Sequence, residues 1–475
     1  MRYVFGLLVG GVLLVLTSPP QASDARTIRL TGEITYNDYE RLFERSFAVP
    51  PGTRRVEVTY TVSGADHRTV VDLGLRGPAG FRGWSGGGKS TVWVSALGAT
   101  PGYLPGPIES GEWAVLLGVP NIRHESHDTY VLTIRLFDTD LPEASYVAKT
   151  GAGWYVGDLH AHSGHSDGTT INRAGTAIPT PPHRVFDAAA AAGLDFIALS
   201  DHNTVSHWLD VDRLQPNYSA LLLLHAREVT TYRGHANAFG ETSFTDFRLP
   251  APTASPAALM ETLHRTGAFV SINHPNRPDD ESCMGCGWNV TDADVMRSID
   301  GIEVVNGTTR TGAMAGWGFW ASRLSEGFRL TAIGGSDTHS IANTRDQGLG
   351  VPATMVYAAE LSERALIEGL KSGRAYVRTK GINGPALEFW ADENGKRIEM
   401  GGVAGATTLT LGARIARADG QSLEWIRNGI VIGVDVIDHD SFSHSWPAKQ
   451  GDWFSLVVRD GSGEPSAISN AIYVR

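Results

Sequence analysis

The stretch GDLHAHSGHSDG, residues 157–168, brings two histidines and an aspartate close together in the chain. His160 and His162 are separated by one residue, so both imidazoles leave the same face of an extended strand. Asp167 follows after a polar turn. Two such histidines are often only exposed or hydrogen bonded, but the spacing also suits two ligands of one metal ion. Other segments must then supply the remaining ligands.

Four later segments share one layout, in which an apolar run ends in residues that can bind a metal ion. They are LDFIALSDHN (194–203), LLLLHAREVTT (221–231), FVSINHP (269–275) and LTAIGGSDTHS (330–340). In an α/β barrel the strands are buried apolar runs, and the reactive residues follow their C-terminal ends. The layout therefore predicts a metal centre at one end of a barrel. The residues that end these runs are Asp201, His202, Glu228, His274, Asp337 and His339.

These motifs resemble those of the PHP metal-dependent hydrolase superfamily, and within it the carbaryl-hydrolase-like (CehA/McbA-type) branch. The resemblance implies a distorted (β/α)7 barrel over about 150–380. It also implies three metal positions that share their ligands. The first would use His160, His162, Glu228 and Asp337; the second Glu228, His274 and His235 of the motif GHANAFG; and the third Asp167, His202 and His339.

Mixed histidine and carboxylate ligands suit Zn²⁺, Mn²⁺ or Fe²⁺, whereas Mg²⁺ and Ca²⁺ prefer oxygen ligands alone. We therefore expect two or three divalent transition-metal ions as cofactors. Such ions lower the pKa of a bridging water, generate hydroxide and stabilise charge on the oxygens of the electrophile. Because the sequence has no evident serine or cysteine nucleophile elbow, direct attack by metal-bound hydroxide is expected.

The expected activity is hydrolysis of a small-molecule phosphoester, the commonest chemistry of the superfamily, which would place the chain among the ester hydrolases. Hydrolysis of an ester or carbamate, as in the carbaryl-hydrolase type, is the alternative. The aromatic segment GWGFW (316–320) would then provide an apolar pocket if it reaches the site. A non-catalytic binding protein with a structural metal is the remote alternative.

Five further residues are candidates for roles beside the metals. Asp201 can orient the imidazole that follows it or accept a proton, which makes it a catalytic candidate with His202. Arg277 can hold an anionic group of the substrate or form a surface ion pair. Glu303 and Asn306 end the apolar strand GIEVVNG and are expected near the substrate. His165 is either a substrate contact or ligand, or a solvent-facing turn residue.

The composition excludes several classes of protein. The chain has 475 residues, too many for one compact core, so we expect two or three domains. Charged residues make up 19% and hydrophobic residues 42%, which excludes a disordered or fibrous chain. The net charge of -11 and the absence of a Lys/Arg cluster argue against nucleic acid as a partner.

The first residues have the layout of a secretory signal peptide. Arg2 precedes the apolar run 4–16, which is short for a membrane span, and small and polar residues follow it. We expect a signal peptide at 1–22 and a secreted or periplasmic protein without a membrane contact after cleavage. An uncleaved N-terminal anchor is the alternative.

The two cysteines, Cys283 and Cys286, are spaced CMGC. In an exported chain this spacing favours a small disulfide, which would stiffen a loop near His274. A redox or zinc site is the alternative, and zinc would need two more ligands nearby.

The remaining patterns predict a multidomain chain of class α/β plus β. Alternating strands separated by Gly/Pro turns indicate an N-terminal β-sandwich, jelly-roll-like, over 27–140. Strands then alternate with helices over 150–380, and short strands return in a second β-sandwich over 384–475. A structural role is favoured for the sandwiches, with carbohydrate contact as the alternative. The predicted helices, each followed by glycine, are 181–192, 255–266, 317–326 and 362–372.

Overall fold

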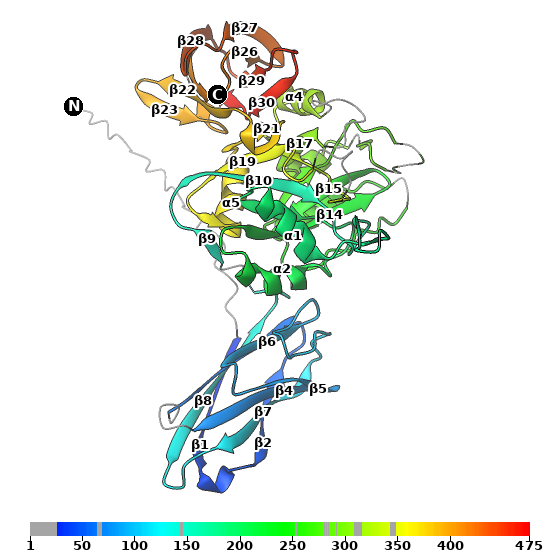
Figure 1. Ribbon diagram of the computed structural model, residues 1–475, viewed down its shortest axis with the longest axis vertical. Helices are drawn as coiled ribbons and strands as arrows, with labels where there is room; N and C mark the ends of the chain where they lie inside the picture. The colour runs from blue at the N-terminus through cyan, green and yellow to red at the C-terminus, as the bar shows by residue number, and fades with distance from the viewer. Residues whose placement is uncertain are drawn as a thin grey trace, which may run out of the picture. The chain divides into compact units, whose positions relative to one another are not determined.

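The computed structural model describes residues 26–63, 69–142, 146–251, 254–279, 281, 283, 285–290, 292–307, 316–342, 348–405 and 407–475. The chain divides into two compact units, Met1–Asp140 and Leu141–Arg475 (Figure 1). The segment expected to be a signal peptide, 1–22, lies outside the described residues. No helix in the described ranges is long and apolar enough to cross a membrane.

The first unit consists of two four-stranded antiparallel sheets around one apolar core. Trp113 and Leu132 are among its buried residues. A short 3-10 helix, η1 (Tyr36–Asp38), follows the first strand. One sheet contains β1 (Arg26–Thr35), β8 (His127–Phe137), β3 (Arg55–Val62) and β6 (Thr91–Ser95), and the other contains β2 (Leu42–Val49), β7 (Gly111–Asn121), β4 (Val70–Gly77) and β5 (Gly80–Gly86).

The second unit is built on a run of seven neighbouring strands. They are β10 (Gly153–Ala161), β13 (Phe196–Leu199), β14 (Leu222–Thr231), β15 (Gly234–Phe239), β16 (Phe269–Ile272), β17 (Gly301–Asn306) and β18 (Thr331–Gly335). Backbone bonds from His162 N to Thr338 O (3.0 Å) and from Asp337 N to His160 O (2.8 Å) join the last strand to the first. The run therefore closes into a ring.

One strand corrects the expectation of a wholly parallel barrel. β15 pairs antiparallel with both β14 and β16, whereas the other neighbours within the run pair parallel. The reason is local, because only two residues, Tyr232 and Arg233, separate β14 from β15 and force a hairpin. The hairpin places His235 beside Glu228.

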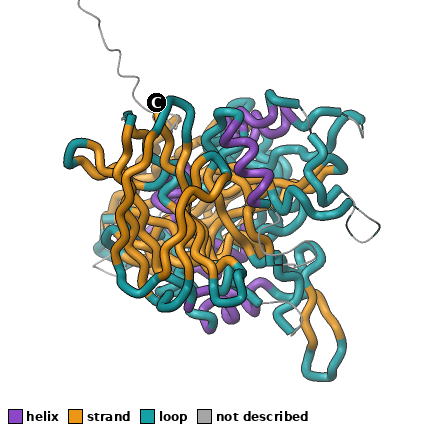
Figure 2. The backbone as a smooth tube through the Cα atoms, turned by 90° about the horizontal axis from the view of Figure 1, so that it is seen from above, coloured by secondary structure: helices purple, strands orange, loops and turns teal. Residues whose placement is uncertain are grey.

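Helices connect most of these strands, although strands make up most of the regular structure (orange in Figure 2). The four predicted helices are present, and the glycine after each has a positive φ, such as +76° at Gly193 and +95° at Gly327. A fifth helix, α2, has seven residues and was not predicted from the sequence. The helices are α1 (Pro182–Ala191), α2 (Trp208–Leu214), α3 (Ala257–Arg265), α4 (Trp317–Ser325) and α5 (Glu363–Lys371), with 3-10 turns η3 (Gln215–Asn217), η4 (Val295–Ser298) and η5 (Gly381–Asn383).

The C-terminal strands continue the sheet of the ring. β10 pairs with β19 (Ala353–Ala358), β19 with β21 (Ala375–Arg378), and β21 with β30 (Pro465–Ser469). The strands of 384–475 form two packed sheets within the same compact unit as the ring. The remaining strands of the larger sheet are β29 (Trp453–Arg459), β26 (Ser422–Arg427) and β27 (Ile430–Val436).

The facing sheet and several short strands complete the unit. Phe389, Trp425 and Leu456 are fully buried between the two C-terminal sheets. The facing sheet contains β23 (Lys396–Glu399), β22 (Ala386–Glu393), β25 (Thr408–Ala416) and β28 (Ser441–Pro447). The short strands are β9 (Val147–Lys149), β11 (Thr169–Ile171), β12 (Ala177–Pro179), β20 (Leu361–Ser362), β24 (Val403–Ala404) and β31 (Ile472–Val474).

Candidate metal centre

The first group of candidate ligands lies where β10, β14 and β18 end. Nε2 of His160 is 3.3 Å from both Glu228 Oε2 and Asp337 Oδ1. Nε2 of His162 is 3.5 Å and 3.1 Å from the same two oxygens. All four side chains are buried. Two imidazole nitrogens and two carboxylate oxygens therefore converge on one point, as the ligands of one ion would.

The second group uses the other oxygen of Glu228. Glu228 Oε1 lies 3.1 Å from Nδ1 of His235 and 3.4 Å from Nε2 of His274. The hairpin of β14 and β15 places His235 directly beside Glu228. Because one carboxylate faces both groups, Glu228 has the geometry of a bridging ligand.

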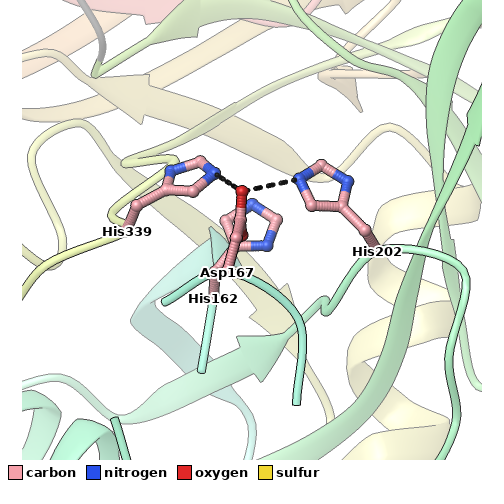
Figure 3. A group of neighbouring side chains, drawn as sticks. All are labelled: His162, Asp167, His202 and His339. Atoms are coloured by element: carbon pink, nitrogen blue, oxygen red, sulfur yellow. Dashed lines mark ion pairs between the residues drawn. The ribbon is translucent and has the colours of Figure 1, made fainter. Parts of the chain in front are cut away.

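The third group surrounds Asp167, which belongs to the turn after β10. Its Oδ2 lies 3.4 Å from Nε2 of His339 and 3.8 Å from Nε2 of His202 (Figure 3). The ring of His162 stacks against both histidines, at centroid distances of 4.1 Å and 4.5 Å. This group is more open than the other two, because the side chains of Asp167, His339 and His202 are 56%, 33% and 25% exposed.

Buried nitrogens in these groups test whether metal ions fit them. Among the described residues, Nε2 of His160, Nδ1 of His162 and Nε2 of His235 are buried without a hydrogen-bond partner. A buried polar atom without a partner costs free energy, so such atoms are rare unless a ligand or water satisfies them. The nitrogen and oxygen donors suit transition-metal ions. The residues present therefore fit bound metal ions.

Contacts behind the ligands fix the direction of several imidazoles. Nδ1 of His274 donates to the carbonyl of Cys286 (3.1 Å), and Nδ1 of His339 donates to the carbonyl of Asp337 (2.9 Å). A carbonyl accepts only, so Nδ1 carries the proton and Nε2 keeps its lone pair for a metal ion. Thr230 Oγ1 lies 2.6 Å from Nδ1 of His202 and leaves its Nε2 facing Asp167.

Uncommon backbone conformations occur at the same place. Asn203, His274 and Asp337 have φ angles of +52°, +28° and +52°, a region that residues with a side chain rarely adopt. Each residue lies just after a strand of the ring. Such conformations cost free energy and cluster at functional sites, so they support a functional role for these strand ends.

The charges of the cluster shift several pKa values. Burial raises the pKa of Glu228, but His202 and His160 outweigh burial and hold it well below its usual range. Burial and His339 lower the pKa of His162 to about 4. Burial lowers the pKa of His202, but Glu228 raises it to about 9. In the absence of metal ions, protons on the histidines therefore balance the negative charge of the buried carboxylates. Bound metal cations would displace these protons.

A cavity of about 400 Å³ opens onto the three groups. Its walls include Asp167, His202, Glu228, His274 and Arg277. This volume lies within the range of sites for small molecules.

Arg277 is the cationic side chain of this cavity. Its Nη1 donates to Asp337 Oδ2 (3.0 Å), beside the amide of Asn306. Asn306 Nδ2 also donates to Glu303 Oε2 (2.9 Å), so the amide holds two carboxylates in place. Arg277 therefore lines the cavity and is paired with a candidate ligand, whereas Asn306 supports the carboxylates.

Asp201 has a different role from the one expected. Its Oδ1 accepts from the backbone of Ser163 (2.8 Å) and from the Ser166 hydroxyl (2.7 Å), and its Oδ2 accepts from the Ser163 hydroxyl (2.7 Å). The carboxylate is buried and directed at the turn after β10, away from the ring of His202. Asp201 therefore shapes the turn that carries Asp167, and its described hydrogen bonds do not include His202. Its role as a proton acceptor stays a prediction.

Two expected substrate contacts are also corrected. Glu303 is buried, and its Oε1 lies 3.1 Å from Nδ1 of His160, while its Oε2 accepts from the backbone of His274 (2.9 Å). It positions ligands instead of facing substrate. His165 interacts with Asp210 (2.9 Å) and Ser206 (2.7 Å) and is not among the residues that line the described cavity.

Sequence reasoning missed several residues behind the ligands. Asn273 Nδ2 donates to Glu228 Oε1 and to Asn237 Oδ1, both at 2.9 Å. Asp158 accepts from the backbone of His160 and of Ser336 (3.1 and 2.9 Å). Side chains two residues apart on a strand lie on the same face. Asp158 is two residues before His160 and Asn237 is two residues after His235, so the spacing could have indicated both.

Cys283 and Cys286 form a disulfide, with their Cα atoms 5.5 Å apart. Both cysteines line the cavity of the metal groups. The expected loop near His274 is therefore part of the wall of the site.

The segment GWGFW does not provide the pocket considered for a carbamate. Trp320 is fully buried in α4, packs in the core and donates from Nε1 to the carbonyl of Leu330 (2.8 Å). Trp317 and Phe319 pack against the same core. These aromatic side chains serve the core of the unit, and the cavity has other walls.

Comparisons with known proteins give distant likenesses. No protein family model matches the chain. The uncharacterized protein MJ1587 of Methanocaldococcus jannaschii is 24% identical over 156 residues, which cover 33% of this chain and 84% of that protein. One solved structure is a two-domain protein of Bacteroides vulgatus that contains a predicted PHP-like metal-dependent phosphoesterase. It is 20% identical to this chain with a TM-score of 0.40, and the match covers 70% of this chain and 96% of that protein.

A periplasmic inhibitor of g-type lysozyme from Aeromonas hydrophila is 13% identical, with a TM-score of 0.16, and covers 24% of this chain and 90% of its own. These similarities are too low to assign the chain to a family. The residues of the site are therefore the basis on which a function can be inferred.

Proposed function

We propose that the chain is a metal-dependent hydrolase of small-molecule phosphoesters, of the PHP type. The observation that carries the proposal is the sharing of Glu228 between two ligand groups, with a third group beside them, on the wall of one cavity that also contains Arg277. The proposed cofactors are two or three divalent ions of Zn, Mn or Fe.

The openness of the third group argues against a purely structural metal. A structural zinc site has four protein ligands and no free position, and it is closed to solvent. Here Asp167, His202 and His339 are partly exposed and line the cavity. A substrate can therefore approach this group, which supports catalysis over the remote alternative of a non-catalytic binding protein.

The side chains of the site have separate tasks in such a reaction. When bound, the metal ions would activate a water molecule and stabilise the negative charge that develops on the substrate. The guanidinium of Arg277 would hold the phosphoryl group by charge-assisted hydrogen bonds. Thr230 and Glu303 would keep His202 and His160 in the orientations that expose Nε2.

A second cavity favours one other candidate, an ester or carbamate hydrolase. It has a volume of about 600 Å³ and shares Thr230 with the metal cavity. Its apolar lining includes Phe247 and Leu249. Two polar side chains of its wall already have partners, since Asn203 is bonded to the backbone of Thr230 and Arg248 to Asp246. The cavity would therefore suit the apolar part of a neutral ester.

We also propose that the protein is exported to the periplasm or the medium and that nucleic acid is not its substrate. The N-terminal layout of residues 1–22, the cysteine spacing and the net charge of -11 support these points. Carbohydrate contact through the sheets of the two sandwiches stays an alternative to a structural role.

Parallel kinetics on a nitrophenyl phosphate, a bis-nitrophenyl phosphate and a naphthyl carbamate test the proposal. We expect the phosphoesters to be hydrolysed best, and Arg277→Ala to lower kcat/KM for them by about 100-fold, because alanine cannot donate charge-assisted hydrogen bonds to a phosphoryl group. Arg364→Ala is the matched control, since Arg364 is an exposed arginine of α5. If the carbamate reacts best and Arg277→Ala has no effect, the second candidate replaces the first.

A further inference from the structure

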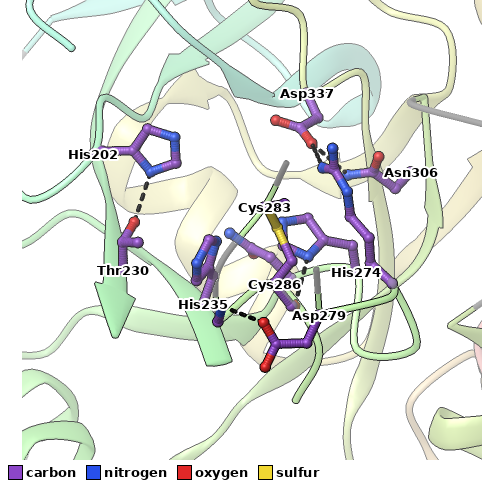
Figure 4. The surroundings of a disulfide bond; sticks show 12 residues. His202, Thr230, His235, His274, Asp279, Cys283, Cys286, Asn306 and Asp337 are labelled. Atoms are coloured by element: carbon purple, nitrogen blue, oxygen red, sulfur yellow. Dashed lines mark hydrogen bonds and ion pairs between the residues drawn. A yellow bond between two sulfur atoms is a disulfide. The ribbon is translucent and has the colours of Figure 1, made fainter. Parts of the chain in front are cut away.

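The disulfide lies directly beside the second ligand group. Cys286, His235 and His274 are all buried, and each presents a ligand atom within 4.8 Å of the others (Figure 4). Nε2 of His235 is buried without a hydrogen-bond partner among the described residues. The carbonyl of Cys286 also accepts from Nδ1 of His274 (3.1 Å), which leaves Nε2 of this ring for a ligand.

The sulfur of Cys286 can have two chemical forms with different affinities for metal. In the disulfide it is a poor ligand, whereas a thiolate is a strong ligand for soft or borderline ions such as Cd²⁺ and Zn²⁺. The spacing CMGC is compatible with either a disulfide or a zinc site, and a zinc site would need two further ligands. His235 and His274 stand where those two ligands would be needed.

We infer that reduction of the Cys283–Cys286 disulfide creates a thiolate metal site made of Cys286, His235 and His274. These three side chains leave a fourth position of the ion, which a water molecule would fill. The second metal position then has one ligand set in the oxidised protein and another in the reduced protein. This inference goes beyond the proposed function and does not depend on any hydrolytic activity.

The redox step is an ordinary thiol–disulfide exchange with a dithiol. The S–S bond between Cys283 and Cys286 breaks, and the dithiol supplies two electrons and two protons while it forms its own disulfide. Both cysteines become thiols. When Zn²⁺ or Cd²⁺ binds, the thiol of Cys286 loses its proton to solvent, and its sulfur forms the bond to the metal.

Two single variants of the full-length protein test the inference. Cys283→Ser leaves Cys286 as a permanent thiol, and Cys286→Ser leaves only Cys283. Metal-free samples of each are titrated with Cd²⁺ alone, and the ultraviolet charge-transfer band of a thiolate–cadmium bond is recorded. A band should appear with Cys283→Ser and be absent with Cys286→Ser. Oxidised wild-type protein should bind Cd²⁺ through nitrogen and oxygen ligands without the band.

A second route avoids dependence on the folding of one variant. Wild-type protein reduced with a phosphine, which becomes a phosphine oxide by taking oxygen from water, should gain the same band. His235→Ala in the reduced protein should weaken it, whereas His264→Ala, an exposed histidine of α3, should not. Equal bands in the two cysteine variants, or Cd²⁺ binding by reduced protein without a band, would overturn the inference. Loss of hydrolysis alone would bear only on the proposed function.

Discussion

The Oε1 atom of Glu303 lies 3.1 Å from Nδ1 of His160, and this contact directs Nε2 of the ring toward Glu228 and Asp337. The contact joins β17 to the end of β10, strands that are far apart in sequence. A ligand with a fixed ring loses less freedom when it binds a metal ion, so the metal affinity of the site depends on this buried carboxylate.

Replacement of Glu303 should therefore weaken metal binding without removing a ligand. We expect Glu303→Ala to lower the affinity of the first position by about 10- to 100-fold, which is typical of contacts behind metal ligands. Glu303→Gln keeps an oxygen that accepts from Nδ1 and should retain part of the affinity. Competition with a chromophoric chelator measures both, and equal affinities for the wild type and the alanine variant would contradict the role.

Removal of His160 and His162 together should abolish metal binding at the first position. The double variant His160→Ala, His162→Ala loses two of four converging ligands, and the remaining carboxylates cannot hold a transition-metal ion alone. Elemental analysis should show at least one ion fewer per chain, and hydrolysis should fall to background. His127→Ala, an exposed histidine of the first unit, is the control. Full metal content with full turnover in the double variant would exclude the assignment.

The apolar cavity beside Thr230 should select the alcohol part of a substrate. Phe247→Ala removes an aromatic wall, so kcat/KM should fall by about 10-fold for a biphenyl phosphate, because less of its apolar surface is then buried, and change little for methyl phosphate. Phe81→Ala, in the first unit, is the matched control because Phe81 is exposed. An equal effect on both esters would show that the cavity does not bind the substrate.

The buried pair of His225 and Glu363 should make stability depend on pH. Burial lowers the pKa of His225, but the carboxylates of Glu363 and Asp212 outweigh burial and raise it to about 10. Because the folded-state pKa is above the ordinary value of 6.5, protonated His225 stabilises the fold fully below pH 6.5, and this contribution is lost as the pH rises toward about 10.

Urea unfolding over this pH range measures the effect. His225→Gln should cost about 2 kcal/mol at the acidic end, the usual worth of a hydrogen bond to a charged group, and less at the alkaline end. The variant should therefore show a flatter dependence of unfolding free energy on pH. His183→Gln is the control, because His183 is an exposed histidine of α1. A cost that is the same at both ends of the pH range would contradict the raised pKa of His225.

The clustering of the candidate ligands was predictable because the sequence records where apolar strands end. His160, Glu228, His274 and Asp337 each follow or end a buried run, and strands of a ring bring their C-terminal ends together. Because side chains alternate along a strand, the sequence also predicted that His225 and Glu228 lie on opposite faces. In the structure His225 contacts Glu363. The ends of α1, α3, α4 and α5 were predictable because a glycine follows each of them, whereas Gln215 follows α2.

Supporting residues such as Asp201 and Glu303 could not be predicted, because their partners are distant in sequence. Asp201 precedes His202 in the chain, yet its carboxylate bonds to Ser163 and Ser166. Glu303 is 143 positions from His160, and no local pattern connects the two. The antiparallel direction of β15 was missed because an apolar run does not show its own direction.

The pairing of β21 with β30 determines whether the ring can be separated from the C-terminal strands. Val377 pairs with Ile468, and both are fully buried in one core. A fragment cut at residue 384 would expose the edge of β21 and the apolar residues of the ring that these C-terminal strands cover, and such edges aggregate. The metal centre is therefore not a portable module: grafting, display or truncation for crystallisation must carry the chain through to its last strand.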